Sequence, residues 1–277
     1  MVFDKAQLKR LFRPHNESNG EDNGQVTIIG GSHLFHGAPN LALIVASRIV
    51  DMVFFATPQE SVGRVAENIK SRLMSFIWIP WEDLDNYIEK SDAILIGPGF
   101  MSYRNEKDRS VVHETKEITE KLLRRFAHKK WVIDAGSLQT MDAKFIPENS
   151  ILTPNKKEYE IIFKNQFSIS NAKEMSQRYK CVIVVKGPTT YVFGDGEMVE
   201  VRGGNPGLTK GGTGDVQAGL TVALFAKNEP MLSACVGSFI TKAAADQLAE
   251  TRGIYYNADD LANKIPEVLF SANDALK

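Results

Sequence analysis

The segment at residues 203–219, GGNPGLTKGGTGDVQAG, carries the strongest chemical signal in the chain. It is rich in glycine as far as Asp215, and the apolar run that follows predicts a helix over residues 214–226. Backbone N–H groups at a helix start have no partner within the helix, and the helix dipole favours negative charge there. The segment therefore predicts an anion site, with phosphate as its natural occupant, built from the backbone of Gly211, Gly212, Thr213 and Gly214.

Asp215 itself allows two interpretations. An acid in the first turn of a helix is stabilised by the helix dipole, so Asp215 could serve the helix alone. That role needs no preceding run of glycines, whereas glycine lets a ligand approach the backbone closely. The glycine run therefore favours an Asp215 that faces the ligand.

Four short segments that contain glycine or polar residues each follow a predicted strand. Each one alone is more typical of a simple turn. Ligands of open α/β sheets bind at the carboxyl ends of the strands, so four such segments in one chain predict a shared crevice. The segments are Gly30-Gly31-Ser32, Gly97-Pro98-Gly99, Asp134-Ala135-Gly136-Ser137 and Thr153-Pro154-Asn155.

Competing motifs are missing from the sequence. It contains no G-x-x-x-x-G-K-[ST], no G-x-G-x-x-G after a strand and no G-x-S-x-G, which argues against P-loop, Rossmann and α/β-hydrolase chemistry. His33 and His36 could form a metal pair, but no cysteine or further histidine lies beside them. We therefore expect a polar loop there.

These residues must be positioned by alternating strands and helices. Apolar strands that alternate with helices indicate a parallel sheet covered on both faces. Asp195-Gly196 then predicts a hairpin, and three helices end the chain. We expect one domain over residues 1–277, with a helix and a surface loop in residues 1–24. The predicted strands are residues 26–29, 52–56, 75–79, 93–96, 131–134, 151–152, 181–185, 190–193 and 198–201, and the predicted helices are 38–49, one capped by Thr57 and Glu60, 104–127, 214–226, 231–250 and 258–270.

Composition limits the function classes. With 33 Lys+Arg against 34 Asp+Glu, the chain lacks the basic excess of a protein that binds nucleic acid by neutralising phosphates. Cys181 and Cys235 lie in apolar runs, a pattern of buried thiols in a reducing compartment. The longest apolar region, residues 41–57, contains Arg48 and Asp51, and the first residues lack an apolar signal core. We expect a cytoplasmic protein that binds neither membrane nor nucleic acid.

The ordered motifs resemble those of the ADP/ATP-dependent NAD(P)H-hydrate dehydratases, a family of the ribokinase-like superfamily. The likeness covers about residues 25–270, and its GNPG-to-GGTGD segment is fairly specific to the family. The matching residues are IGGS with Gly37-Ala38-Pro39, Gly97-Pro98-Gly99, Asp134-Ala135, Thr153-Pro154 with Glu158, Val185-Lys186-Gly187 with Thr189 and Thr190, GNPGL at 204–208 and GGTGD at 211–215.

The resemblance implies a three-layer α/β/α fold with a mainly parallel central sheet and a terminal β-hairpin. It implies repair of NADHX and NADPHX, the hydrated forms of NADH and NADPH, by phosphorylation of the ring hydroxyl and elimination of phosphate. ADP or ATP would donate the phosphoryl group, Mg²⁺ would be the cofactor, and the protein would form a homo-oligomer.

The resemblance also assigns roles to residues. Asp215 would accept or orient the hydroxyl proton, and Gly212 and Gly214 would stabilise the phosphoryl group. Glu158 would hold Mg²⁺ through water. The nucleotide-binding residues would be Lys186, Gly187, Pro188, Thr189, Thr190, Gly211, Thr213 and Gly214. The substrate-binding residues would be Ala38, Gly97, Gly99, Asn155, Asn205 and Asp215.

Three departures from the family pattern leave alternatives open. The family often has a smaller, more glycine-rich run where this chain has residues 186–190. Asn155 stands where the family usually has histidine, and Gly136 where it usually has a second acid. The resulting N-x-x-E at Asn155 and Glu158 resembles the kinases of the superfamily, so a small-molecule kinase for a sugar, hydroxymethylpyrimidine or thiazole alcohol is the alternative. A non-catalytic nucleotide-binding protein is the third hypothesis, against which the intact Asp215 segment argues.

Overall fold

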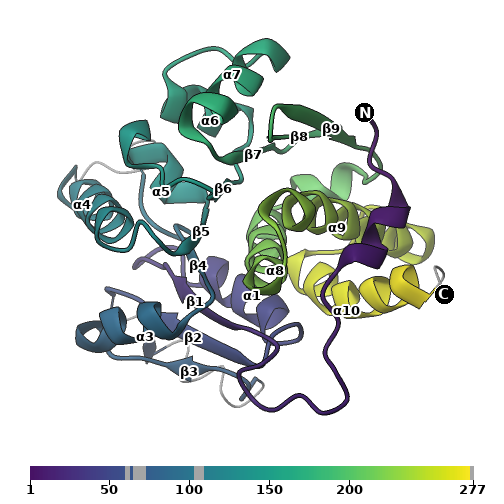
Figure 1. Ribbon diagram of the computed structural model, residues 1–277, viewed down its shortest axis with the longest axis horizontal. Helices are drawn as coiled ribbons and strands as arrows, with labels where there is room; N and C mark the ends of the chain where they lie inside the picture. Colours follow the sequence, from purple (N-terminus) through teal and green to yellow (C-terminus); the bar gives the residue numbers. More distant parts are fainter. Residues whose placement is uncertain (60–62, 65–72, 103–108, 275–277) are drawn as a thin grey trace.

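The computed structural model describes residues 1–59, 63–64, 73–102 and 109–274. Within them, nine strands form one sheet in the order β3-β2-β1-β4-β5-β6-β7-β8-β9 (Figure 1). Neighbours from β3 to β7 pair in parallel, and β8 is antiparallel to both β7 and β9. The strands are β1 (Gln25–Ile29), β2 (Met52–Ala56), β3 (Ile77–Trp78), β4 (Ala93–Ile96), β5 (Lys130–Ile133), β6 (Ile151–Leu152), β7 (Val182–Val185), β8 (Thr190–Gly194) and β9 (Glu197–Val201).

Helices cover both faces of the sheet because its central strands are apolar on both sides. In β4, Ala93 and Leu95 belong to one core, whereas Ile94 and Ile96 belong to the other. The first face is covered by α1 (Gly37–Ala46), α8 (Thr213–Lys227) and α9 (Pro230–Arg252). The second face is covered by α3 (Leu84–Lys90), α4 (Arg109–Arg125), α5 (Ala135–Thr140), α6 (Lys156–Phe163) and α7 (Ile169–Tyr179). The predicted three-layer α/β/α arrangement is confirmed.

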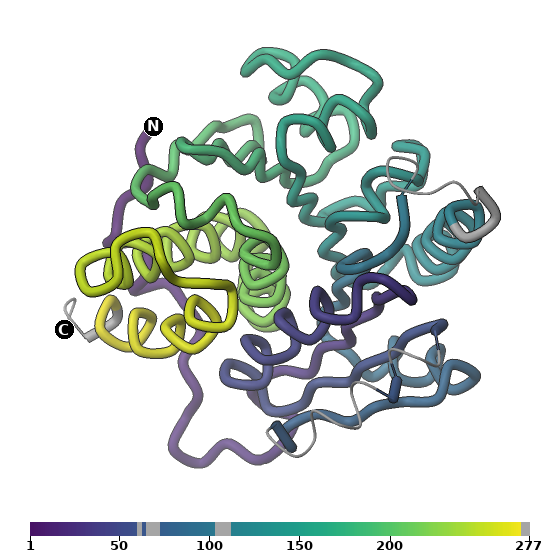
Figure 2. The backbone as a smooth tube through the Cα atoms, turned by 180° about the vertical axis from the view of Figure 1, so that it is seen from behind, coloured from purple at the N-terminus to yellow at the C-terminus, as the bar shows by residue number. Residues whose placement is uncertain are grey.

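A further helical layer lies outside α1, α8 and α9. Helix α10 (Ala258–Asp274) packs there with the 3-10 helix η1 (Lys5–Arg10), which buries Leu8. The N-terminal segment runs along this outer layer in both views (Figures 1 and 2). Its first residues continue along β9, where Val2 pairs with Glu200, so they cover the edge strand of the sheet.

The sequence located most elements correctly. The strands, the hairpin at Asp195-Gly196 and the three last helices are confirmed, and the predicted N-terminal helix is the 3-10 helix η1. Helices α5, α6 and α7 were not predicted, because they are short and α7 buries only a few side chains. Glu60, of the predicted cap with Thr57, and residues 104–108 of the predicted long helix lie outside the described residues.

The strand order reverses between β1 and β4, and this reversal positions the site. At such a switch point the loops that leave two neighbouring strands diverge to opposite faces and open a crevice. The loops after these strands touch: the Gly31 N–H donates to the Pro98 carbonyl at 2.8 Å. The Gly136 N–H, after β5, donates to the Gly97 carbonyl at 3.3 Å. The predicted gathering of glycine segments at the carboxyl ends of the strands is confirmed for the three segments that follow β1, β4 and β5.

Candidate active site

The glycine run ends at the start of α8, as predicted. Gly212 is the N-cap residue with φ +92°, and a Cβ there would lie 2.5 Å from Leu41 Cδ1, so only glycine fits. Thr213 fixes the turn because its hydroxyl donates to the carbonyls of Leu208 and Lys210. In the described chain, the N–H groups of Gly212 and Gly214 donate to no other backbone group. They remain available to an anion.

Four charged side chains meet at the carboxyl ends of the strands. Asp134 follows β5, Glu158 lies in the first turn of α6, Lys186 follows β7, and Asp215 lies in the first turn of α8. The Lys186 ammonium donates to Asp134 Oδ1 at 2.8 Å, and Thr153 Oγ1 donates to the same oxygen at 2.8 Å. The side chain of Asp134 is 2% exposed and that of Lys186 19%, so this is a buried ion pair.

Lys186 also lies against the glycine run. A Cβ built on Gly214 would be 3.4 Å from the Lys186 ammonium nitrogen. The ammonium and the free N–H groups of the α8 start therefore border the same space. A phosphoryl group held there would meet the Lys186 ammonium as well as the helix dipole.

The cluster holds more acid than base, which shifts the pKa values of its members. Burial raises the pKa of Asp215 to about 7, the charge of Asp134 adds to this, and Lys186 opposes it. Burial also raises the pKa of Glu158, with Asp134 acting in the same direction and Lys186 against it. Burial alone would lower the pKa of Lys186, but the charges of Asp134 and Glu158 outweigh it and raise that pKa. Asp215 can thus take up or release a proton near neutral pH, as a general base requires.

Asn155 and Glu158 form a capping box at the start of α6. Asn155 Oδ1 accepts from the N–H groups of Lys157 and Glu158, and Glu158 Oε2 accepts from the Asn155 N–H at 2.8 Å. Gln139 Nε2 donates to the other oxygen of Glu158 at 3.0 Å. The N-x-x-E pattern therefore has a local structural cause. The predicted contacts of Asn155 with substrate and of Glu158 with metal-bound water stay predictions.

Gly136, where the resemblance predicts an acid, has no room for a side chain. A Cβ there would lie 2.3 Å from the Phe100 carbonyl oxygen. Likewise, a Cβ on Gly97 would lie 1.9 Å from the Asp134 carbonyl oxygen. The loops after β4 and β5 are packed so tightly that no acid fits at position 136 in this backbone.

The residues predicted to contact substrate fall into two groups. Gly97, Gly99 and Ala38 lie together at the switch point: Gly99 has φ +75°, and a Cβ there would lie 3.1 Å from Pro39 Cδ, the neighbour of Ala38 in α1. Asn205 is different, because its amide is fully used within the protein. The predicted contact of Asn205 with substrate stays a prediction. Its Oδ1 accepts from Gly207 N and Tyr256 Oη, and its Nδ2 donates to Ala245 O and Asp246 Oδ1.

The predicted nucleotide-binding turn, residues 186–190, connects β7 to β8. Gly187 and Pro188 are exposed, Thr189 is half-buried, and Thr190 is buried with its hydroxyl 3.5 Å from the Gly187 carbonyl. Lys242 of α9, which was not among the predicted residues, donates from its ammonium to the Gly187 and Pro188 carbonyls of this turn. A lysine inside the apolar pattern of a buried helix was the available signal.

Among the residues that the structure describes, the site forms no protein cage for a metal. In the described residues, no group of three His, Cys, Asp or Glu side chains is placed to hold an ion. His33 is exposed and His36 half-buried in the loop before α1. Mg²⁺ is commonly held by substrate phosphates, waters and one or two carboxylates, and the acid excess around Lys186 fits that mode.

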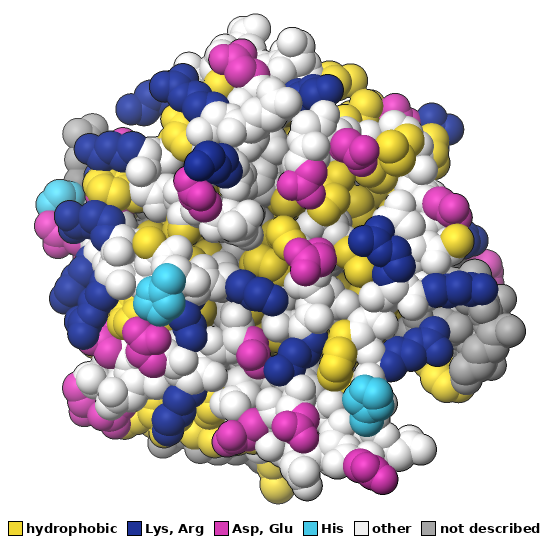
Figure 3. Space-filling view, in the orientation of Figure 1, with side chains coloured by type: hydrophobic (Ala, Val, Ile, Leu, Met, Phe, Trp, Pro, Cys, Tyr) yellow, Lys and Arg dark blue, Asp and Glu magenta, His cyan; other side chains and the backbone are white. Residues whose placement is uncertain are grey.

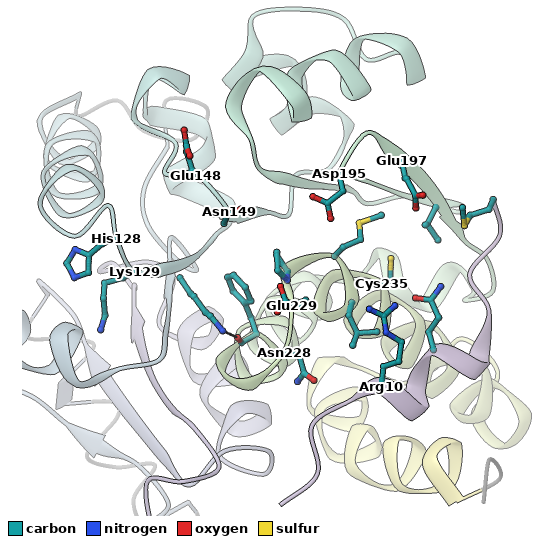
Figure 4. A pocket seen from close by; sticks show the side chains of 18 residues that line it. Arg10, His128, Lys129, Glu148, Asn149, Asp195, Glu197, Asn228, Glu229 and Cys235 are labelled. Atoms are coloured by element: carbon teal, nitrogen blue, oxygen red, sulfur yellow. Dashed lines mark hydrogen bonds between the residues drawn. The ribbon is translucent and has the colours of Figure 1, made fainter.

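A cavity of about 600 Å³ lies elsewhere, at the amino ends of the strands (Figure 4). It is lined by Lys130 at the start of β5, by Asp195 in the β8–β9 turn and by Glu229 before α9. Lys130 donates to the carbonyls of Phe225 and Ala226, at the end of α8 opposite Asp215. The cavity is therefore separate from the cluster at Asp215.

On the face seen in Figure 3, lysines and arginines are interspersed with acids rather than gathered in one field. Among the described helices, none is long and apolar enough to cross a membrane. Cys181 and Cys235 are free and buried, as predicted.

The sheet order and the glycine-rich start of α8 with its acid define the ribokinase-like fold. A ribokinase-like superfamily protein from Enterococcus faecalis superposes with a TM-score of 0.82 at 21% identity, covering 98% of this chain and 95% of the other. An ADP/ATP-dependent NAD(P)H-hydrate dehydratase from Bacillus subtilis, co-crystallised with ATP and Mg²⁺, superposes with a TM-score of 0.78 at 21% identity, covering 98% of both chains.

The chain belongs to the NAD(P)H-hydrate dehydratase family, whose model matches residues 26–267. A bifunctional NAD(P)H-hydrate repair enzyme from Methanocaldococcus jannaschii is 37% identical over 276 residues, which are 95% of this chain and 52% of the relative. An ADP-dependent (S)-NAD(P)H-hydrate dehydratase from Cenarchaeum symbiosum is 27% identical over 283 residues, covering 94% of each. The chain thus spans about half the length of the bifunctional relatives it matches.

Proposed function

We propose that this protein converts NADHX and NADPHX back to NADH and NADPH with ADP or ATP as phosphoryl donor. One observation carries the proposal: Asp215, with a pKa of about 7, lies at the glycine-rich start of α8 beside Lys186. Membership of the dehydratase family supports the choice of substrate.

The proposed reaction has two steps. The ring hydroxyl oxygen attacks the terminal phosphorus of the nucleotide, its proton passes to the Asp215 carboxylate, and the shortened nucleotide leaves. The lone pair of the ring nitrogen then expels phosphate, and loss of a proton from the adjacent ring carbon restores the double bond. Phosphate leaves far more readily than hydroxide, which is why the phosphoryl donor is needed.

The protein's own groups stabilise the transferring phosphoryl group. The free N–H groups of Gly212 and Gly214 would meet its oxygens, and the Lys186 ammonium beside Gly214 would add a positive charge. These donors are held in place before the substrate binds, which is the condition for effective electrostatic stabilisation. The turn from Lys186 to Thr190, with Gly211 and Thr213, would line the rest of the nucleotide.

Mg²⁺ would supply positive charge that neutralises the phosphate oxygens. Glu158 fits an outer role through water, because both its oxygens already accept hydrogen bonds within the protein. Ala38, Gly97 and Gly99 would border the hydrated nicotinamide at the switch point, with Asn155 and Asn205 at its margin.

The structure weakens the case for a small-molecule kinase. The N-x-x-E pattern at Asn155 is a capping box, and the missing acid at Gly136 follows from the close Phe100 carbonyl. The departures at Asn155 and Gly136 thus have local physical causes and need no change of substrate.

The direct test mixes the purified protein with NADHX, Mg²⁺ and either ADP or ATP, and follows the return of reduced-nicotinamide absorbance. Recovery with one nucleotide would support the reaction and name the donor.

Asp215→Asn should abolish turnover and leave nucleotide binding roughly unchanged. Asp195→Asn is the matched control, because this acid lies in the distant β8–β9 turn at φ +52°, which asparagine tolerates. No recovery with either nucleotide would contradict the proposal and call for a screen of alcohol substrates.

The expectation of a homo-oligomer stays a prediction. Sedimentation at micromolar concentration tests it directly.

A further inference from the structure

Helix α9 carries a lysine whose ammonium lies inside the protein. Lys242 is 5% exposed. Its ammonium nitrogen donates to three carbonyl oxygens, those of Gly187 at 3.1 Å, Pro188 at 2.8 Å and Gly203 at 2.9 Å. An ammonium has three N–H donors, so the three carbonyls satisfy it completely. The carbonyls come from the two loops that flank the β8–β9 hairpin, the β7–β8 turn and the segment after β9.

Asp246 extends this contact by one helical turn. Residues four apart lie on the same side of a helix, so Lys242 and Asp246 face the same loop. Asp246 Oδ2 accepts from the Gly204 N–H at 2.8 Å, and Asp246 Oδ1 accepts from Asn205 Nδ2 at 3.3 Å. One face of α9 therefore binds the Gly203 carbonyl, just before the GNPG segment, through its lysine and the Gly204 amide through its acid.

Lys242 contacts the two exposed residues of the β7–β8 turn. Gly187 and Pro188 are exposed, and Thr190 Oγ1 lies 3.5 Å from the Gly187 carbonyl, which makes a weak bond at best. The Lys242 ammonium forms shorter bonds to both carbonyls from beneath. Without the Lys242 ammonium, the Gly187 and Pro188 carbonyls would lose a charged hydrogen-bond donor.

We propose that Lys242 is a positioning residue that fixes the β7–β8 turn against the start of the GNPG segment and so sets the affinity for the nucleotide. The inference rests on the proposed function, in which this turn lines the nucleotide site. Lys242 itself touches no substrate, because its three donors are used within the protein.

Lys130 offers a matched control at the other end of the sheet. Burial lowers the pKa of both lysines, and Lys130 likewise donates to backbone carbonyls, those of Phe225 and Ala226. Lys130 is the more exposed of the two. Its removal breaks a lysine–carbonyl contact that holds no loop of the nucleotide site. Comparing Lys242→Met with Lys130→Met therefore separates loss of positioning from loss of stability.

The experiment measures nucleotide Kd by calorimetry, KM for nucleotide and for NADHX, and the thermal midpoint of each variant. We expect Lys242→Met and Lys242→Ala to weaken nucleotide binding about tenfold or more, since small misplacements of binding groups have effects of this size. The KM for NADHX should change far less. Propylammonium should restore nucleotide binding to Lys242→Ala by placing an ammonium among the three carbonyls, whereas tetramethylammonium, which has no N–H donor, should not.

Each outcome bears on the proposal. Nucleotide Kd within about twofold of the wild-type value in Lys242→Met, with a lowered thermal midpoint, would overturn it. Equal loss of affinity in Lys130→Met would also overturn it, because general destabilisation would then explain the effect. If the wild-type protein binds nucleotide but does not repair NADHX, the proposed reaction fails while the Kd comparison still decides the role of Lys242. If it binds no nucleotide, both proposals fail.

Discussion

Lys186 and Asp134 form a buried ion pair across the carboxyl ends of β7 and β5, with 2.8 Å between Nζ and Oδ1. Thr153, which directly follows the intervening strand β6, donates to the same carboxylate oxygen. The pair fixes the ammonium beside the start of α8. It thereby connects the sheet to the anion site.

Removing the lysine should therefore affect stability strongly. Lys186→Met leaves the Asp134 carboxylate buried with Thr153 as its remaining partner, and breaking such a pair costs about 3 kcal/mol. Urea unfolding at pH 7 measures this loss. The control is Lys180→Met, which breaks an exposed pair with Glu148 and should cost less than about 1 kcal/mol. Equal losses in the two variants would contradict a buried role for Lys186.

The rate of repair should depend on the ionisation of Asp215. Because its pKa is about 7 and the carboxylate is the form that accepts a proton, kcat/KM for NADHX should rise with pH through about 7 and then level. Stopped assays from pH 5 to pH 9 give the profile. A flat profile between pH 5 and pH 8 would show that another group takes the proton.

The same pKa shift has a consequence for stability. In the folded protein the pKa of Asp215 is about 7, against 3.8 for an ordinary aspartate, so the folded state binds the proton more tightly. The stability that this proton contributes is present below about pH 4 and is lost as the pH rises through about 7. The Asp215→Asn variant does not lose this stability as the pH rises, because asparagine does not ionise. Its free energy of unfolding should match that of the wild type near pH 4 and exceed it above pH 7, and a constant difference across this range would sink the prediction.

Gly136 should tolerate no side chain. Gly136→Ala places a Cβ against the Phe100 carbonyl, and we expect a loss of about 2 kcal/mol from the shift this forces. Gly37→Ala is the control, because nothing lies within 4 Å of a Cβ at that helix start. Thermal unfolding of both variants tests the contrast. An unchanged midpoint in Gly136→Ala would mean that the loops after β4 and β5 are less tightly packed.

The bond between Tyr256 and Asn205 should anchor the GNPG segment. Tyr256 is 2% exposed and its hydroxyl donates to Asn205 Oδ1 at 2.8 Å. Tyr256→Phe should cost about 1 kcal/mol, and Asn205→Ala more, because it leaves several buried groups unpaired. A double-mutant cycle by urea unfolding should show coupling between the two; strictly additive losses would argue against the bond.

Local features of the site could be predicted from the sequence alone. The glycine run before Asp215 indicated a helix start with free N–H groups, because helix starts and positive-φ glycines depend on a few neighbouring residues. The strands were visible for the same reason, since apolar runs and turn residues are local. N-x-x-E at Asn155 was equally local, but the sequence did not distinguish a capping box from a kinase signature.

Only the tertiary structure determined which of these segments meet. Lys186 pairs with Asp134 because the strand order places β6 between β5 and β7, and 52 residues separate the pair in sequence. Lys242 reaches Gly187 across 55 residues because α9 packs beneath the β7–β8 turn. The pKa of Asp215 follows from the same convergence, because burial and the charge of Asp134 act on it only in the folded chain. Electrostatic and steric effects depend on distance in space, and that distance is fixed by the packing of the whole sheet and its helices.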